Sequence, residues 1–225
     1  MRGIAFIGGE RPPPEHCAAL AAGANCIVAA DSGLLAAEAA GITPHWIIGD
    51  MDSLDDPRRL EKYPPEQVLR WPPDKDDTDT ELALKLLWEA GCGETWLIGG
   101  GGGRLDHLLA ISALFEREKA PNRWLTASND VRRVIPGESI RLDLPPGSLV
   151  SVFPLGTGPW HVVSGSLKWP LNGVSWYRGY AGISNVSTGN PVTIDVAAGR
   201  FLVILPRIEA GNDDDSRRGG ALIKE

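Results

Sequence analysis

Two aspartates that follow a short apolar run are the first candidates for chemistry in this sequence. Asp50 and Asp52 come directly after residues 45–48, His-Trp-Ile-Ile, which are typical of a buried strand. Residues two apart in an extended chain point the same way, so both carboxylates are expected at the strand's carboxyl end, where open α/β sheets bind ligands. Like charges about 4 Å apart repel by about 4 kcal/mol at an effective dielectric constant of about 20, and a bound metal is the simplest compensation. The alternative is that both are turn or capping residues, because aspartate is common in these places.

Another aspartate follows a second predicted strand. Residues 26–30 are continuously apolar and end at Asp31. A predicted helix over residues 34–40 then leads to the strand before Asp50. A strand, a helix and a strand joined by short loops, without alternation of polar and apolar residues, are typical of a parallel sheet that is covered on both faces. Asp31 and Asp50 are therefore expected at the same edge of one sheet.

The third acidic segment, residues 74–81, has the sequence Asp-Lys-Asp-Asp-Thr-Asp-Thr-Glu and precedes a predicted amphipathic helix. Thr78 and Glu81 fit a capping box, and Asp79 suits the helix dipole. Capping does not account for the three aspartates that crowd just before the helix. The segment therefore adds weight to the metal-site interpretation of the first two.

Five consecutive glycines, residues 99–103, follow a predicted strand over residues 95–98 and lead to Arg104 and Asp106. A glycine junction between a strand and a helix exposes backbone N–H groups to an anion, so this loop could hold a phosphate. It matches neither a Walker A loop nor the G-x-G-x-x-G fingerprint. A glycine run by itself is more often a flexible turn.

A helix is predicted to follow this loop, over residues 105–119. Its expected apolar face consists of Leu105, Leu108, Leu109, Ser112 and Phe115. His107, in its first turn, is interpreted as a surface or partly buried residue and not as a base or ligand.

The pattern changes after residue 124, where short predicted strands alternate with turn signals and no long helical period remains. The predicted strands are 141–144, 149–154, 161–167, 173–177, 191–196 and 201–205. The predicted fold class is therefore α/β, with a parallel-sheet domain over residues 1–133 and a small all-β sandwich or barrel over residues 134–208. Residues 209–225 are predicted to be a disordered tail.

Composition narrows the range of functions. The formal net charge of −7 argues against a general nucleic-acid or anionic-membrane binder, and an acidic protein that handles phosphates needs metal ions as intermediaries. The three cysteines have no C-x-x-C spacing and suggest buried residues of a reducing compartment. With no signal peptide or membrane-spanning run expected, we predict a cytoplasmic location.

Six motifs in this order resemble the thiamine pyrophosphokinase family, over residues 4 to about 206. They are Ala30-Asp31-Ser32-Gly33, Gly49-Asp50-Met51-Asp52-Ser53, Asp74-Lys75-Asp76-Asp77-Thr78-Asp79, Gly102-Gly103-Arg104-Leu105-Asp106-His107, Leu167-Lys168-Trp169-Pro170-Leu171 and Ile183-Ser184-Asn185. The resemblance implies an α/β catalytic domain that binds ATP and Mg²⁺ and an all-β domain that binds thiamine. It also implies transfer of the terminal diphosphate of ATP to the hydroxyl of thiamine, which gives thiamine diphosphate and AMP. The family's homodimer, in which each β domain completes the partner's site, is the expected assembly.

The resemblance also implies roles for individual residues. The metal-holding carboxylates would be Asp50, Asp52 and Asp79, with Asp31 beside them as a further catalytic carboxylate. ATP would be bound by Asp77, Gly101, Gly102, Arg104 and Asp106. Thiamine would be bound by Trp169, which would stack on its pyrimidine, and by Ser184 and Asn185, which would hydrogen-bond its polar edge.

Several alternatives stay open at this point. Trp169 could fill the core, as most strand tryptophans do. The acceptor could be another alcohol, or water, which would make the protein a different Mg-dependent kinase or a nucleotide pyrophosphohydrolase. A non-catalytic thiamine or nucleotide sensor is the third hypothesis.

Overall fold

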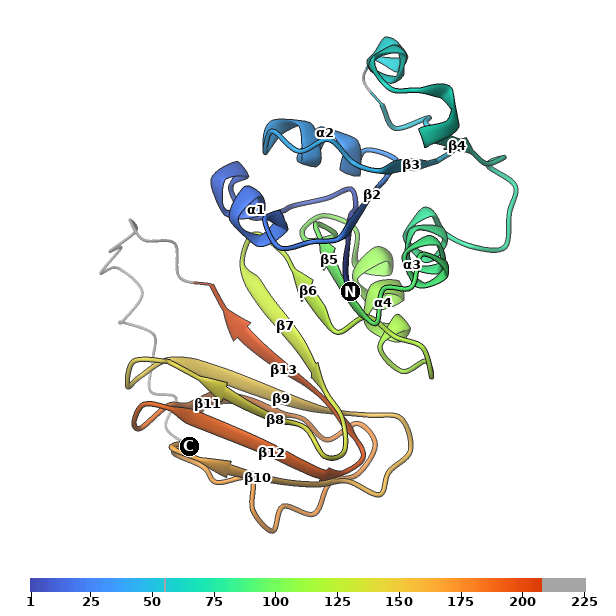
Figure 1. Cartoon of the computed structure of the whole chain (residues 1–225). Coiled ribbons are helices and arrows are strands. Elements are labelled where there is room, and N and C mark those ends of the chain that lie inside the picture. Colours follow the sequence, from blue (N-terminus) through green and yellow to red (C-terminus); the bar gives the residue numbers. More distant parts are fainter. Residues whose placement is uncertain (55, 208–225) are drawn as a thin grey trace, which may run out of the picture.

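The computed structural model describes residues 1–54 and 56–207. Six parallel strands form the first part of its main sheet (Figure 1). They are β1 (Arg2–Phe6), β2 (Cys26–Ala30), β3 (Trp46–Gly49), β4 (Val68–Arg70), β5 (Glu94–Ile98) and β6 (Arg123–Leu125), in the spatial order β6-β5-β1-β2-β3-β4. This is the parallel sheet that the strand–helix–strand pattern predicts.

Helices cover both faces of this parallel part. Alternate residues of β1 point to opposite sides, as strand geometry requires. Ile4 and Phe6 pack in one core cluster with α1 (Pro14–Ala21) and α2 (Gly33–Ala39), while Ala5 packs in another with α3 (Asp79–Glu89) and α4 (Leu105–Leu114). The connection from β3 to β4 carries two short 3-10 helices, η1 (Pro57–Lys62) and η2 (Pro65–Gln67).

Four antiparallel strands extend the same sheet beyond β6. They are β7 (Asn129–Val134), β9 (Leu149–Leu155), β11 (Gly182–Val186) and β13 (Arg200–Pro206), and the full order is β11-β9-β13-β7-β6-β5-β1-β2-β3-β4. The boundary predicted at residues 133–134 thus falls inside β7, which pairs with β6 on one side and with β13 on the other.

A second sheet of three strands packs on this antiparallel part and makes a sandwich. It contains β8 (Ser139–Leu142), β10 (His161–Gly165) and β12 (Val192–Ala198) in the order β10-β12-β8. Side chains of both sheets share one core cluster, for example Val152 and Phe201 from the large sheet with Val162 and Ile194 from the small one. The sandwich predicted for this part of the chain is therefore present.

Three expectations about elements were wrong. Residues 173–177 form the end of a turn and an irregular segment, not a strand, and Trp176 packs its ring edge-on against Phe201, 5.2 Å between centroids. The helix that was expected to reach residue 119 ends at Leu114. Its expected apolar face was wrong for Leu105 and Leu109, which are 67% and 62% exposed, and right for Phe115, which is buried, and Leu108, which packs against the core. Ile111 and Leu114, which were not expected to face inward, are also buried.

The sequence analysis also did not assign β6, β7 and β11 as strands. The predicted tail, residues 209–225, lies outside the described residues. None of the helices within residues 1–54 and 56–207 is long and apolar enough to cross a membrane.

Candidate functional site

Three carboxylates from different segments meet at the carboxyl edge of the parallel strands. Asp31 follows β2, Asp50 follows β3 and Asp79 is the first residue of α3. One oxygen of each lies within 4.8 Å of the others, and all three side chains are partly buried. β2 and β3 are adjacent parallel strands, with Ala30 opposite Ile48, so their ends deliver Asp31 and Asp50 to one place.

The backbone at this edge adopts unusual conformations that permit the close approach. Asp31 and Met51 have φ values of 48° and 67°, in the left-handed region that residues other than glycine seldom occupy. Gly49 has a φ of 142°, and a Cβ there would lie 3.2 Å from Asp79 Cγ and 3.3 Å from Asp31 Cβ. A side chain at position 49 would therefore push the carboxylates apart.

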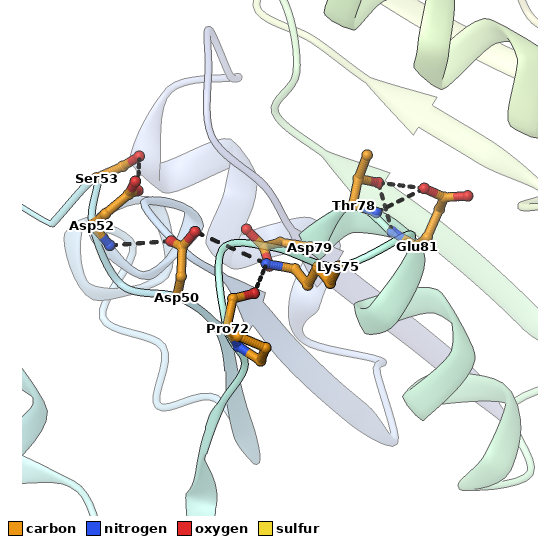
Figure 2. A network of polar contacts seen from close by, with 8 residues as sticks. All are labelled: Asp50, Asp52, Ser53, Pro72, Lys75, Thr78, Asp79 and Glu81. Carbon is orange, nitrogen blue, oxygen red and sulfur yellow. Dashed lines mark hydrogen bonds and ion pairs between the residues drawn. The ribbon is translucent and has the colours of Figure 1, made fainter.

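Asp79 is fixed by the start of its helix. Thr78 and Glu81 form the predicted capping box, in which Thr78 Oγ1 accepts from the Glu81 N–H at 3.3 Å and Glu81 Oε2 accepts from the Thr78 N–H at 2.9 Å (Figure 2). Arg117, just beyond α4, forms an ion pair with Glu81. Burial opposes the charged form of Glu81, but its bonds to Thr78 and Arg117 outweigh this and lower the pKa of the carboxyl.

The electrostatics of the cluster favour a cation. Burial raises the pKa of Asp79, the nearby Lys75 ammonium opposes the shift, and Asp50 and Asp31 add to it. Among the described residues, Asp31 Oδ1 and Asp79 Oδ1 are buried without a hydrogen-bond partner. Buried carboxylate oxygens that make no hydrogen bond are costly, and oxygens are the ligands that Mg²⁺ prefers. The residues present therefore fit a magnesium ion.

Asp52 lies outside the three-carboxylate cluster, although it shares the turn with Asp50. Its backbone N–H donates to Asp50 Oδ1 at 3.2 Å, and its exposed carboxylate accepts from Ser53 Oγ at 3.0 Å (Figure 2). The expectation that Asp50 and Asp52 point the same way assumed an extended chain. The positive φ of Met51 breaks that geometry and turns the two side chains apart.

A cavity of about 1040 Å³ opens beside the carboxylates. Its walls come from five segments: the loop after β1, the turn after β2, Ser53 in the turn after β3, the acidic segment with the start of α3, and the glycine loop with α4. Asp31, Asp77, Gly101, Gly102 and Arg104 all line it. A volume of this size suits a nucleotide.

The glycine loop is tied to the loop that follows β1. The Glu10 N–H donates to the Gly101 carbonyl at 2.8 Å, and the Gly101 N–H donates back to the Glu10 carbonyl at 3.1 Å. The N–H groups of Gly99 and Gly100 donate to the carbonyls of Leu125 and Gly8. The N–H groups of residues 99–101 are thus used within the fold, and the first part of this loop is a rigid wall of the cavity, not a set of open anion donors.

The remaining residues predicted to bind ATP form ion pairs with neighbouring side chains. Arg104 and Asp106 are exposed and bind each other, with Arg104 Nη2 2.5 Å from Asp106 Oδ2, and the Arg104 hydrogen bond lowers the pKa of Asp106 to about 2. Asp77 pairs with Lys85 at 2.5 Å. A bound phosphate would compete with Asp106 for Arg104.

Residues predicted to bind thiamine lie in the sandwich. Trp169 is 54% exposed, so it is not a core residue, and Lys168 Nζ lies 4.6 Å from the centre of its ring. Ser184 has a φ of 58° at an irregular point of β11 and is exposed. Asn185 is buried, accepts from the Trp169 N–H at 3.1 Å and donates to the Trp169 carbonyl at 2.6 Å. The hydrogen bonds of Asn185 therefore hold Trp169 in place, and its direct contact with thiamine stays a prediction.

Comparison with known proteins identifies the group to which this chain belongs. The family model described as "Thiamin pyrophosphokinase, catalytic domain" matches residues 17–124, which include all three clustered aspartates and the glycine loop. The thiamine pyrophosphokinase of Bacillus subtilis is 30% identical over 151 residues, which make up 64% of this chain and 70% of the relative. The chain belongs to the thiamine pyrophosphokinase family.

Solved structures of thiamine pyrophosphokinase family members share the fold over nearly the whole chain. A family protein from Enterococcus faecalis is 25% identical, with a TM-score of 0.73 over 93% of this chain and 100% of its own. The enzyme from Geobacillus thermodenitrificans is 26% identical, with a TM-score of 0.72 over 93% of this chain and 99% of its own. The similarity to thiamine pyrophosphokinases therefore extends through the sandwich as well as the catalytic domain.

Sequence reasoning did not identify two residues of this site. Gly49 makes room for the carboxylates, and Lys75 places its ammonium group among them. The signal for Lys75 was present, because it is the one cation in a segment of carboxylates. The importance of Gly49 depends on a φ angle and a close approach that spacing does not reveal.

Proposed function

We propose that this chain transfers the diphosphate of ATP to the hydroxyl group of thiamine, giving thiamine diphosphate and AMP, with Mg²⁺ as cofactor. The observation that carries the proposal is the meeting of Asp31, Asp50 and Asp79 beside a cavity large enough for a nucleotide. Asp31 and Asp79 line this cavity, and each has a buried oxygen that makes no hydrogen bond. Membership of the thiamine pyrophosphokinase family supports the choice of reaction.

In this proposal Asp50 and Asp79 hold the metal, with Asp31 beside them and Asp52 as a further ligand from the edge of the turn. When bound at these carboxylates, Mg²⁺ would neutralise the charge of ATP. The rigid glycine loop shapes the nucleotide cavity, with Gly101, Gly102 and Asp77 on its wall. Arg104 exchanges its pairing with Asp106 for the phosphates, which its planar fork suits.

Positioning supplies most of the expected acceleration. The alcohol must lie in line with the β-phosphorus and the AMP leaving group, since the P–O bond to AMP breaks as the new P–O bond forms. An aspartate of the site accepts the alcohol's proton. Trp169 offers an exposed aromatic face to the flat pyrimidine and cationic thiazolium of thiamine.

We also propose a homodimer in which the sandwich of one subunit completes the acidic site of the other. The described residues that line the cavity all lie between Ile7 and Arg117, so none comes from the sandwich of the same chain. Trp169, Ser184 and Ile183 are exposed and available to a partner.

AMP release from ATP by the purified protein tests the function. We expect AMP and thiamine diphosphate in equal amounts, formed only when thiamine and Mg²⁺ are both present and abolished by EDTA. Asp50→Asn and Asp52→Asn should each cut turnover at least about a hundredfold, because each removes a contact to transferring charge. Asp56→Asn, a nearby aspartate outside the cavity, should stay within about twofold of the unchanged protein.

Other outcomes favour the other hypotheses. AMP released without thiamine would identify a pyrophosphohydrolase or a kinase with another acceptor. Binding of ATP or thiamine without any turnover would identify a sensor. Full activity of Asp50→Asn would contradict the metal assignment.

A further inference from the structure

A lysine occupies the centre of the acidic site. The Lys75 ammonium lies 3.1 Å from Asp79 Oδ1 and 3.9 Å from Asp50 Oδ2, and it donates a hydrogen bond to the Pro72 carbonyl at 3.2 Å (Figure 2). Its side chain is only 11% exposed. The function proposed above assigns no role to this residue.

The ammonium group lies at the carboxylate oxygens that a metal ion would need. It lies closest to Asp79 Oδ1, which is also one of the buried oxygens without a hydrogen-bond partner, so the contact is an ion pair that is not aligned as a hydrogen bond. A divalent cation held by Asp50 and Asp79 would need the same oxygens. Two cations at such short range repel each other, so the lysine and the metal bind these carboxylates in competition.

We propose that Lys75 is the resident counter-ion of the acidic site and competes with the divalent cation for Asp50 and Asp79, thereby setting the metal affinity. The inference rests on the metal site of the proposed function. Without metal, Lys75 holds together carboxylates that would otherwise repel. When metal binds, the ammonium must leave these oxygens, and the cavity wall to which Lys75 already belongs gives it room.

A second lysine of the same region serves as a matched control. Lys85, on α3, pairs with Asp77 at 2.5 Å, but its side chain is 49% exposed and it does not contact the clustered carboxylates. Replacing either lysine by methionine removes one positive charge and keeps most of the chain length. Only the change at position 75 removes a competitor from the metal-binding oxygens.

The test measures Mn²⁺ binding to the full chain without nucleotide, by electron paramagnetic resonance of free Mn²⁺. Lys75→Met should bind Mn²⁺ about tenfold more tightly than the unchanged protein, the factor expected when one charge-assisted contact no longer has to be displaced. Lys85→Met should stay within about twofold. Lys75→Arg, which keeps the charge, should not bind more tightly.

Thermal unfolding gives a second readout. In EDTA, Lys75→Met should melt below the unchanged protein because its carboxylates repel without a counter-ion, and saturating Mn²⁺ should remove the difference. A general loss of stability would leave that difference in place, and would not tighten metal binding.

The outcomes separate this inference from the function on which it rests. Equal Mn²⁺ affinity in Lys75→Met and the unchanged protein would overturn the role of Lys75 and leave the metal site standing. Equal tightening in Lys75→Met and Lys75→Arg would show that shape and not charge matters, and would also overturn it. If no variant binds Mn²⁺, the metal assignment and the inference fail together.

Discussion

Gly49 leaves space for two carboxylates that a Cβ at this position would crowd. We expect Gly49→Ala to lower the free energy of unfolding by about 2–3 kcal/mol, because the new Cβ meets Asp79 and the φ of 142° is strained for alanine. Mn²⁺ affinity should fall about tenfold as the carboxylates separate. Urea unfolding and Mn²⁺ titration measure the two effects.

Gly41→Ala is the control for this substitution. Gly41 also has a positive φ, 69°, but a Cβ there would have no atom within 4 Å. It should cost about 1 kcal/mol of stability through backbone strain and leave Mn²⁺ affinity unchanged. Equal metal affinity in both variants would show that Gly49 does not shape the site.

At the scale of single residues, the sequence predicted the acidic positions better than their arrangement. Asp31 and Asp50 follow apolar runs that can only be strands, so their shared edge could be foreseen. The separation of Asp52 from the cluster could not, because it depends on a left-handed residue, Met51, where an extended turn was assumed. The exposure of Trp169 likewise depends on tertiary packing that a single sequence does not reveal.

At the scale of elements, α3 and α4 are joined at the site. Arg117 binds Glu81 of the capping box that fixes Asp79, and Arg200 of β13 donates to the carbonyls of Glu116 and Arg117 at 2.8 and 2.7 Å. A connected path therefore runs from the sandwich through the end of α4 to the start of α3. Through this path the sandwich helps to hold the Asp79 carboxylate, which it does not contact.

The Arg117–Glu81 pair should matter more to metal binding than to stability. Arg117→Met and Glu81→Gln should each lower stability by about 1 kcal/mol, since one partner is half-exposed, and weaken Mn²⁺ binding severalfold because Asp79 begins the capped helix. A double-mutant cycle by urea unfolding and Mn²⁺ titration measures the coupling. Strictly additive effects on Mn²⁺ affinity would contradict a role in positioning Asp79.

A second ion-pair group joins the parallel and antiparallel parts of the large sheet. Asp130 of β7 accepts from Arg123 of β6 at 2.6 Å and from Arg132 at 2.9 Å. Burial opposes the charge of Asp130, but the two arginines outweigh it and lower the pKa of the carboxyl below its ordinary 3.8. A lowered folded-state pKa stabilises the fold above the ordinary value, and that stability is lost as the pH falls through the folded-state pKa.

Asp130→Asn should therefore lower the free energy of unfolding by about 3 kcal/mol at pH 7, because it leaves two arginines without their carboxylate. The difference from the unchanged protein should shrink as the pH falls below about 4, where Asp130 begins to be protonated in the unfolded chain. Urea titrations between pH 3 and 7 measure it. A difference that is constant over this range would contradict the assignment.

Element prediction succeeded where local signals were strong. The capping box placed the start of α3 correctly, because both partners lie within four residues. The buried face of α4 was predicted only in part, because the helix carries apolar residues nearly all round, and only contact with the sheet decides that Ile111 and Leu114 point inward. β6 and β11 are short and gain their strand conformation from neighbours in the sheet.

At the scale of the whole molecule, the proposed shared site makes a direct prediction about mixed dimers. Asp50→Asn damages the acidic site, and Trp169→Ala should raise the thiamine requirement about tenfold or more while leaving ATP binding nearly unchanged. Co-expression of the two variants should restore about a quarter of full activity, because half the dimers are mixed and one of their two sites is intact. The assay uses thiamine at a level where each parent variant is nearly inactive.

Activity no higher than the mean of the two parents would contradict a site shared between subunits. The matched control co-expresses Asp50→Asn with Asp79→Asn. Both changes lie in the same part of the site, so every mixed dimer keeps two damaged sites and no recovery is expected.

At this scale, the sequence predicted a parallel α/β half and a β-rich half, but it did not predict that the two halves share one sheet. Changing periodicity after residue 124 correctly indicated a β-rich second half. β6 and β7 form a hairpin, and β6 pairs on its other edge with β5, so this half merges with the parallel sheet. The pairing of β6 with β5 joins distant residues and is not visible in local composition. The predicted boundary at residues 133–134 falls inside β7, the first antiparallel strand of the large sheet, and does not separate two sheets.

The place of β13 in this sheet bears on how the protein is made. β13 is the last described strand in the chain, yet it lies between β7 and β9 and pairs with both (Figure 1). During translation, β13 leaves the ribosome 45 residues after the end of β9 and 66 residues after the end of β7, and the edges of both strands that pair with it stay open until then. The acidic edge can assemble early, but the nascent chain needs protection from edge-to-edge association until its interior strand is inserted.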